Sequence, residues 1–498
     1  MDSNTKGGPT LSTNVLSLLT APRRVYAAVS GGADSIAVAS LLDDAKRVHS
    51  FLQAPVILHV HHGLRGKEAD ADEQFVADWA EEHEWRFRSS HVNAAEVARQ
   101  TGQSIETAAR VLRYAFFAHV LEEERIEGEA KPLLFLGHHL QDQAESILFH
   151  ILRGCGPDGL SGMTEIEERP AFFLVRPLLS ATKEQILQFH RDRHSSWRED
   201  HTNQQMEATR NRLRGMLFPA IRQEINPAVD DALVRLSTIA REENAYLENM
   251  ATAAFAQIST NGKEEEPFSA TSLSRNACFL QSIALSKEKF LAQPVALQRR
   301  LVRHWVARLV EAGKTATLSF EDEEEIRRHF ERPSGKCLSL YGMMFLTDFE
   351  GVHALSLARF QALEREAGEG QMLSVEYDGQ PFALFSGQCT FTRVTKVDSA
   401  TVSSLASLPA ACCAVDVTGL DTLIWRCAQP GDTFVSFGGG SKPLRKMWNA
   451  WHVPAVLRKT WPILTDGKDI LWVLGLGRSA MRVVEPGRDM VVINWRRI

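Results

Sequence analysis

The feature that most constrains the fold of this chain is a glycine-rich turn that directly follows a short apolar run. The run Val25–Ser30 (VYAAVS) has the length and composition of a buried strand, and the stretch Ile36–Asp44 has those of the helix that follows it. Between them lies Ser30-Gly31-Gly32-Ala33-Asp34-Ser35. Glycines let the backbone turn sharply, and the exposed amides at a helix N-terminus attract phosphate oxygens. The turn therefore predicts an anion-binding loop.

Strand and helix patterns continue to alternate after this loop. Repeated strand–helix–strand units favour a mainly parallel sheet that is covered on both faces. We therefore expect an α/β domain over residues 1–218. The further expected strands are Val56–His61, Phe87–Val92 and Leu133–Gly137, and the expected helices are Glu68–Glu82 and Ile105–Glu124.

The 498 residues are too many for one hydrophobic core, and typical domain sizes suggest about three domains. Long helical patterns at Asp230–Ile258 and Ala296–Ala312 predict a helical middle domain over 219–365. Small residues and short β-like runs suggest a connecting segment at 366–415. Short strands separated by Gly and Pro predict a small α/β or β-rich domain at 416–498.

Composition and cysteine spacing argue against several classes of protein. Apolar residues make up 44% and charged residues 24% of the chain, which is typical of globular proteins. Its start is polar, and no apolar run reaches the roughly 18 residues of a membrane span. The seven cysteines are scattered without a C-x-x-C pair, which weakens a disulfide framework, a zinc ribbon and a redox pair. We expect a cytoplasmic protein without a membrane partner.

The charge is distributed unevenly along the chain. The net charge is -6, yet Asp421–Ile498 contains twelve Lys and Arg against six Asp and Glu. Basic side chains position a phosphate backbone, so this region is a candidate for RNA binding. The interleaved tryptophans fit a core better than a base-stacking surface. The basic residues are Lys442, Arg445, Lys446, Arg458 and Lys459, and the tryptophans are Trp448, Trp451 and Trp461.

The glycine-rich loop lacks the G-x-x-x-x-G-K-[ST] pattern of a Walker A loop. It resembles instead the S-G-G-x-D-S loop of the ATP pyrophosphatases. That resemblance implies that ATP is the cofactor and that Ser30, Gly31, Gly32, Ala33, Asp34 and Ser35 grip its phosphates. A carboxylate at Asp34 would be repelled by phosphate unless Mg²⁺ bridged them, so a magnesium ligand is expected there. The alternative is a simple helix cap.

Further segments stand in the order found in the tRNA(Ile)-lysidine synthetases, and the chain resembles that family almost throughout. In the first domain they are His62-Gly63-Leu64-Arg65, Glu106 through Arg110 to Arg113-Tyr114, His138-His139-Leu140-Gln141-Asp142-Gln143-Ala144-Glu145 and Arg210-Asn211-Arg212-Leu213-Arg214. Later ones are Asn226-Pro227, Pro430-Gly431-Asp432 and Gly439 to Lys446. The implied fold is a PP-loop ATP pyrophosphatase domain, a helical domain and a C-terminal tRNA-recognition domain.

The resemblance also implies a reaction. ATP adenylates the 2-oxygen of the wobble cytidine in a tRNA(Ile) with a CAU anticodon, and pyrophosphate leaves. The ε-amine of free L-lysine then attacks carbon 2 of the ring, and AMP leaves. The expected partners are therefore this tRNA and lysine. A homodimer is compatible with the sequence, which does not fix the oligomeric state.

Two pairs of charged residues fit catalytic roles. Asp142 and Glu145 are three apart on an expected helix, so they share a face and can hold the lysine ammonium or take up its proton. Arg110 and Arg113 also share a face and can stabilise phosphate or the charge that develops on the base. The alternative for each pair is a solvated helix surface.

The remaining candidates are histidines and arginines. His138 follows a strand end, where parallel sheets place ligands, so it is either a nucleotide or base contact or a structural histidine. The resemblance implies a nucleotide contact for His62. For Arg210, Arg212 and Arg214 we expect contact with tRNA phosphate or AMP, against surface charge as the alternative. Lys442, Arg445 and Lys446 are the expected tRNA contacts of the C-terminal domain.

Two positions depart from the family pattern, and two other functions compete. His61 stands where an aspartate usually precedes His-Gly-Leu-Arg, and Gln141 replaces the first of two adjacent aspartates. One competing function is another ATP pyrophosphatase such as a tRNA thiolase, although the chain lacks the cysteine pair that thiolation usually needs. The other is an inactive tRNA-binding homologue, against which the presence of Asp34, Asp142 and Glu145 argues.

Overall fold

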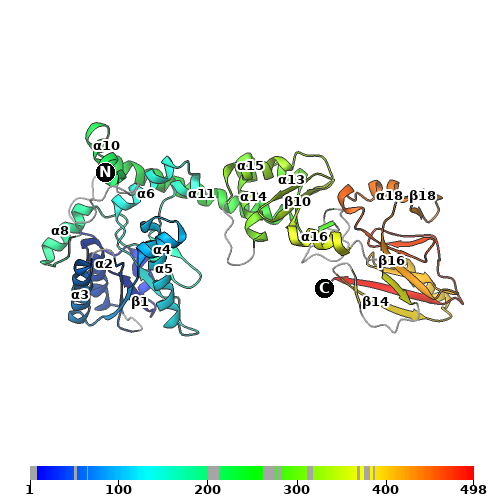
Figure 1. Ribbon diagram of the computed structural model, residues 1–498, viewed down its shortest axis with the longest axis horizontal. Coiled ribbons are helices and arrows are strands. Elements are labelled where there is room, and N and C mark those ends of the chain that lie inside the picture. Colours follow the sequence, from blue (N-terminus) through cyan, green and yellow to red (C-terminus); the bar gives the residue numbers. More distant parts are fainter. Residues whose placement is uncertain are drawn as a thin grey trace. The chain divides into compact units, whose positions relative to one another are not determined.

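The computed structural model describes residues 8–49, 53–63, 66–199, 212–261, 282–310, 318–366, 371–374, 382–384 and 387–497, with Leu273, Asn276, Ala277 and Leu280. The chain divides into two compact units, Met1–Ala245 and Tyr246–Ile498. Figure 1 labels helices and strands along the chain.

A six-stranded sheet forms the centre of the first unit. Its order is β3-β2-β1-β4-β6-β5, and all neighbours are parallel except β5, which runs antiparallel to β6. The predicted parallel sheet and its four predicted strands are confirmed. The strands are β1 Val25–Ala28, β2 Val56–His61, β3 Arg86–His91, β4 Leu133–Phe135, β5 Ile166–Glu168 and β6 Phe173–Val175.

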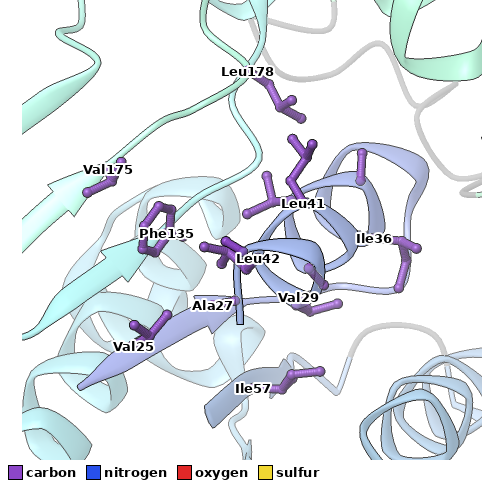
Figure 2. Packing of buried hydrophobic residues seen from close by; sticks show 14 of the residues in the cluster. Val25, Ala27, Val29, Ile36, Leu41, Leu42, Ile57, Phe135, Val175 and Leu178 are labelled. Carbon is purple, nitrogen blue, oxygen red and sulfur yellow. The ribbon is translucent and has the colours of Figure 1, made fainter. Parts of the chain in front are cut away.

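Helices cover both faces of this sheet, as alternate side chains of β1 show. Val25 and Ala27 point into a core shared with α2, and Tyr26 points into a second core shared with α5. Figure 2 shows Leu42 of α2 packed towards Ala27 and Phe135. Because strand side chains alternate between faces, each strand contributes to both cores. Full burial of such a side chain stabilises the fold by roughly 1.5–3 kcal/mol.

The helices of the first unit include the predicted α2, α3 and α5. Their bounds are α1 Thr13–Leu19, α2 Ala33–Lys46, α3 Lys67–Glu82, α4 Ala94–Thr101, α5 Ile105–Glu123, α6 Leu140–Leu152, α7 Pro157–Leu160, α8 Lys183–Arg193, the π-helix η2 Leu213–Leu217, α10 Phe218–Glu224 and α11 Val229–Ile258, of which the residues up to Ala245 belong to this unit. Leu213 and Phe218 are buried against Ala144 of α6. This packing fixes the start of η2 beside α6.

The middle part of the chain contains an antiparallel sheet as well as the predicted helices. Its order is β7-β8-β11-β10-β9, and a core around Trp305, Phe330 and Phe345 joins it to α14 and α15. The elements are β7 Ser259–Asn261, β8 Ile283–Ser286, α13 Lys287–Leu291, α14 Val295–Leu309, α15 Phe320–His329, β9 Cys337–Leu340, β10 Met343–Thr347, β11 Gly351–Ser356 and α16 Leu357–Glu366.

Two further sheets and a short hairpin complete the second unit. The sheets have the orders β12-β16-β19-β20-β21 and β13-β14-β22-β15, and they share a core that includes Trp425, Trp472 and Ile493. The strands are β12 Gln371–Ser374, β13 Phe382–Leu384, β14 Gly387–Val394, β15 Cys412–Asp416, β16 Thr422–Cys427, β17 Thr433–Val435, β18 Ser441–Pro443, β19 Pro462–Thr465, β20 Ile470–Val473, β21 Gly477–Arg478 and β22 Met490–Arg497, and the helices are α17 Ser399–Ser404 and α18 Leu444–Ala450.

Residues 366–415 were expected to form a connecting segment, but the structure contains strands of the C-terminal sheets there. Strand β14 pairs with β22 along its whole length, from Gly387 opposite Arg497 to Val394 opposite Met490. Strand β15 pairs with the other edge of β22. Residues 366–415 thus supply β14 and β15, which pair with the two edges of β22 near the end of the chain. Within the described residues, no helix is long and apolar enough to cross a membrane.

Candidate active site

The glycine-rich loop lies at the carboxyl end of β1, where the neighbouring strands are β2 and β4. Gly31 has φ +92°, which glycine adopts without strain, and Gly32 is the N-cap of α2. The Ser35 hydroxyl donates to the Gly32 carbonyl (2.9 Å) and accepts from the Ser30 amide (3.2 Å). Asp34 lies in the first turn of α2. The predicted strand, loop and helix are confirmed.

Two buried histidines hold the backbone around this loop. His59 Nδ1 lies 2.9 Å from the Val29 carbonyl, and His190 Nε2 lies 2.7 Å from the Ala33 carbonyl. A carbonyl accepts only, so each of these ring nitrogens carries the proton. Burial lowers the pKa of both imidazoles below the usual value, which keeps them neutral near pH 7. The sequence analysis missed both residues.

A cavity of about 510 Å³ opens beside the loop. Parallel sheets bind ligands at the carboxyl ends of strands where the strand order reverses, and β1 lies at such a point between β2 and β4. The cavity brings together most of the predicted nucleotide-site residues from five separate segments. It is lined by Ser30, Gly32, Asp34, Ser35, His61, His62, Arg110, Arg113, His138 and Arg214, among others.

His138 follows β4, lines this cavity and has an unused polar atom. Its Nδ1 is buried, and no partner for it lies within hydrogen-bonding distance among the described residues. Burial lowers the pKa of His138 to about 4, although the nearby Asp142 carboxylate opposes the shift. A neutral imidazole can accept or donate one hydrogen bond at each nitrogen. An unpaired buried nitrogen in a cavity wall fits a ligand contact better than a structural role.

Asp142 and Glu145 share one face of α6, as the spacing predicts. Asp142 Oδ2 accepts from the His139 amide (3.0 Å) and thereby caps the helix. Burial alone would raise the pKa of Asp142, but the adjacent His139, its amide and Arg214 together lower it below the usual value. Glu145 is 7% exposed. The two carboxylates form a largely buried pair in the first two turns of α6.

The guanidinium of Arg214 binds both carboxylates. Its Nε donates to Glu145 (2.7 Å), and Nη2 donates to Glu145 and Asp142 (2.8 Å each). The hydrogen bonds to Glu145 raise the pKa of Arg214 further above its usual value. Sequence reasoning placed Arg214 with the tRNA-contacting arginines, and the structure places it on the acidic pair. Arg214 lies at the acidic pair because the preceding residue, Leu213 of η2, is buried against α6.

Lys183 is a cation beside Asp34 that was not predicted from the sequence. It is the first residue of α8, and its Nζ donates to Asp34 Oδ1 at 2.6 Å. Gln141, one of the two departures from the family pattern, accepts from the Lys183 amide (3.1 Å). Its side chain therefore positions the start of α8. The ion pair between Lys183 and Asp34 joins residues 149 apart in sequence, so no local pattern could have revealed it.

The arginines of α5 lie at the cavity wall. Arg110 and Arg113 are both exposed to solvent, and the Arg110 guanidinium lies over the Tyr114 ring at 5.3 Å. Both line the cavity, so their positive charge is available to a phosphate or base bound there. Arg212 is exposed. Arg210, like Leu64 and Arg65, lies outside the described residues.

The predicted tRNA contacts of the C-terminal region lie on β18 and α18 of the second unit. Lys442, Arg445 and Lys446 are all exposed. The tryptophans between them were expected in the core, and Trp448 (4% exposed) and Trp461 (0%) are buried there. Arg458 has an internal role instead, because it donates to the Val453 carbonyl and to the Asn449 side chain.

Comparisons with known proteins match two parts of the chain to protein families. Residues 9–221 match the family model of the PP-loop domain, and residues 423–495 match that of the TilS substrate C-terminal domain. Among curated proteins, the tRNA(Ile)-lysidine synthases of Geobacillus kaustophilus and Solibacter usitatus are each 28% identical to the chain. The alignments cover 96% of both chains in the first case, and 94% of this chain and 97% of the relative in the second. That of Bacillus cereus is 27% identical over 92% of this chain and 90% of its own.

Proposed function

The chain belongs to the tRNA(Ile)-lysidine synthetases, and from this premise we propose that it joins free L-lysine to carbon 2 of the wobble cytidine of a tRNA(Ile) with a CAU anticodon. ATP is consumed to AMP and pyrophosphate. One observation supports the proposal above others. Arg214 lines the nucleotide cavity and also binds Asp142 and Glu145, so the ATP loop and the acidic pair belong to one site.

In the first step, the 2-oxygen of the cytidine attacks the α-phosphorus of ATP. A bond forms between that oxygen and phosphorus, the bond to the bridging oxygen breaks, and pyrophosphate leaves. The amides of the loop and the N-terminus of α2 hold the pyrophosphate oxygens. Arg110 and Arg113 lie at the cavity wall, where they offset the negative charge that develops on the α-phosphate. The unpaired His138 nitrogen is available to the nucleotide or the base.

The residues present fit a magnesium ion bound together with ATP. Mg²⁺ is usually held by one or two carboxylates plus substrate phosphates, and Asp34 supplies one half-buried carboxylate to the cavity. The ion would neutralise phosphate charge. Lys183 already lies on Asp34, so it would share or exchange this contact when the phosphates enter.

In the second step, the lysine ε-amine attacks carbon 2 of the activated ring. The bond from carbon 2 to the adenylated oxygen breaks, AMP leaves with that oxygen, and the nitrogen loses a proton. An amine attacks only when it is neutral, so the ammonium of free lysine must first lose a proton as well. Asp142 and Glu145 hold this ammonium and take up the proton. The lowered pKa of Asp142 suits the holding role.

The tRNA is held by basic side chains of both units. Arg210 and Arg212 serve the first unit, where Arg214 is held by the acidic pair, and Lys442, Arg445 and Lys446 serve the second. Arg212, Lys442, Arg445 and Lys446 are exposed and therefore accessible to a phosphate backbone. We place the protein in the cytoplasm, where tRNA, ATP and lysine occur together. Light scattering of the purified chain tests whether it forms a homodimer.

The decisive measurement is incorporation of radiolabelled lysine into a tRNA(Ile) transcript with a CAU anticodon, with ATP and Mg²⁺ present. We expect incorporation that disappears when the anticodon cytidine is replaced by uridine. ATP consumption without lysine incorporation would favour another pyrophosphatase substrate, as in a thiolase. Binding of the transcript without ATP consumption would favour an inactive homologue.

A further inference from the structure

A cluster of two histidines and two carboxylates lies beside the nucleotide cavity and has no role in the proposed reaction. His61 ends β2, His91 ends β3, and Asp70 and Glu73 lie on α3. Asp34, proposed above for Mg²⁺, is not part of it. Among the described residues, His61, Glu73 and His91 are the one group whose possible ligand atoms all lie within 4.8 Å of one another.

The fold itself brings these four side chains together. His61 and His91 are register partners on adjacent parallel strands, so their side chains point to the same face, and their rings stack with centroids 4.4 Å apart. Asp70 and Glu73 are three residues apart on α3 and share a helix face. His61 Nε2 lies 3.1 Å from Asp70, and His91 Nε2 lies 2.8 Å from Glu73.

We propose that His61, His91 and Glu73, with Asp70 as a fourth ligand, bind a divalent transition-metal ion, with Zn²⁺ as the best match. Imidazole nitrogens and carboxylate oxygens suit Zn²⁺, which takes four such ligands in a tetrahedron, whereas Mg²⁺ prefers oxygen ligands alone. The ion replaces the two hydrogen bonds between imidazole and carboxylate. It thus binds to neutral histidines and ionised carboxylates.

The geometry permits this exchange with side-chain movements alone. Ligand atoms about 2 Å from a tetrahedral ion lie roughly 3.4 Å apart, so the group must contract and one stacked ring must tilt. The side chains of His91 and Asp70 are 62% and 66% exposed, so both can turn, while His61 (9%) and Glu73 (18%) stay fixed. The site therefore combines two fixed ligands, His61 and Glu73, with two exposed ligands, His91 and Asp70, that can move to the ion.

The position of the cluster gives the ion a consequence. His61 also lines the nucleotide cavity. When Nε2 binds the ion, the neutral ring carries its proton on Nδ1, so the present contact of Nδ1 with the Gly63 amide (3.3 Å) is released. The neighbouring His62 is a proposed nucleotide contact. An ion that ties the ends of β2 and β3 to α3 therefore fixes the backbone from which His62 projects. The site is structural and lies outside the reacting groups.

The test is metal binding by the full chain after treatment with a chelator and dialysis. Zn²⁺ is titrated by calorimetry with Mg²⁺ in large excess, so that weak oxygen sites are filled. We expect one Zn²⁺ per chain, a raised unfolding temperature on binding, and visible d–d bands of tetrahedral Co²⁺ without a thiolate-to-cobalt charge-transfer band. The last readout separates this site from the cysteines.

Two variants and a control locate the ion. His91→Ala and Glu73→Gln should each weaken Zn²⁺ binding at least about tenfold and remove the rise in unfolding temperature. His119→Ala, which removes an exposed histidine of α5 in the same unit, should change neither. The proposal is overturned if the wild type binds no Zn²⁺, or if His91→Ala binds it as tightly as the wild type. Neither outcome bears on lysine incorporation, so the proposed function is tested separately.

Discussion

Replacing Gly137 by alanine should damage the ATP loop without touching any charged group. Gly137 follows β4, and a Cβ atom built there lies 3.0 Å from the Asp34 carbonyl carbon and 3.0 Å from the Ser35 amide nitrogen. Both contacts are with backbone at the start of α2. That backbone cannot move aside as a flexible side chain would, because Ala33 and Ile36 beside it are packed in the core.

The magnitude follows from the cost of overpacking. An extra methyl group in a well-packed region costs about 1–3 kcal/mol. In a unit of this size, such a loss lowers the unfolding temperature by on the order of 5 °C. Relief of the clash requires the start of α2 to shift by a few tenths of an ångström, and the loop amides shift with it. We expect ATP to bind on the order of tenfold more weakly, which corresponds to about 1.4 kcal/mol.

Gly156→Ala is the matched control. Gly156 is exposed, has an ordinary φ of -83°, and a Cβ atom there meets no other atom within 4 Å. Thermal unfolding and tRNA-dependent ATP–pyrophosphate exchange are measured for both variants and the wild type. If Gly137→Ala matches the wild type in both measurements, the close packing of β4 against the ATP loop does not constrain the site, and the reasoning is refuted.

Three further predictions concern charged and buried groups. Asp142→Asn should lower lysine incorporation at least about a hundredfold, because the amide carries no charge for the ammonium, while its fold, followed by circular dichroism, stays intact. Arg214→Met should tighten calorimetric binding of lysine without tRNA by about tenfold, since the guanidinium occupies the acidic pair, whereas Arg212→Met should not. Burial lowers the pKa of His329 to about 4. Above about pH 6.5 this group should not affect the free energy of unfolding. As the pH drops towards 4, the unfolded chain binds a proton that the folded chain does not, so the free energy of unfolding should fall by up to about 3 kcal/mol. Urea titrations of wild type and His329→Gln at pH 7 and 4.5 check this, and an equal loss in both would contradict it.

The middle sheet shows where helical periodicity misled the sequence analysis. The runs Met343–Thr347 and Gly351–Ser356 are apolar and separated by a short turn, which is a hairpin signal, yet the long helices nearby dominate the pattern. Strands of three residues such as β5 and β6 offer even less periodicity. The role of 366–415 could not be predicted, because strand pairing across about 100 residues leaves no local mark.

The sequence alone determined the local parts of this protein. An apolar run, two glycines and a following helix are sufficient for the ATP loop, and the three-residue spacing of Asp142 and Glu145 places them on one face, because backbone geometry and helical period act over a few residues. Tertiary structure decided the contacts of Lys183 with Asp34, of Arg214 with Glu145 and of His61 with His91. These contacts span 149, 69 and 30 residues. Such contacts depend on strand order, register and the packing of η2, which burial of apolar surface fixes over the whole unit rather than any short stretch of chain.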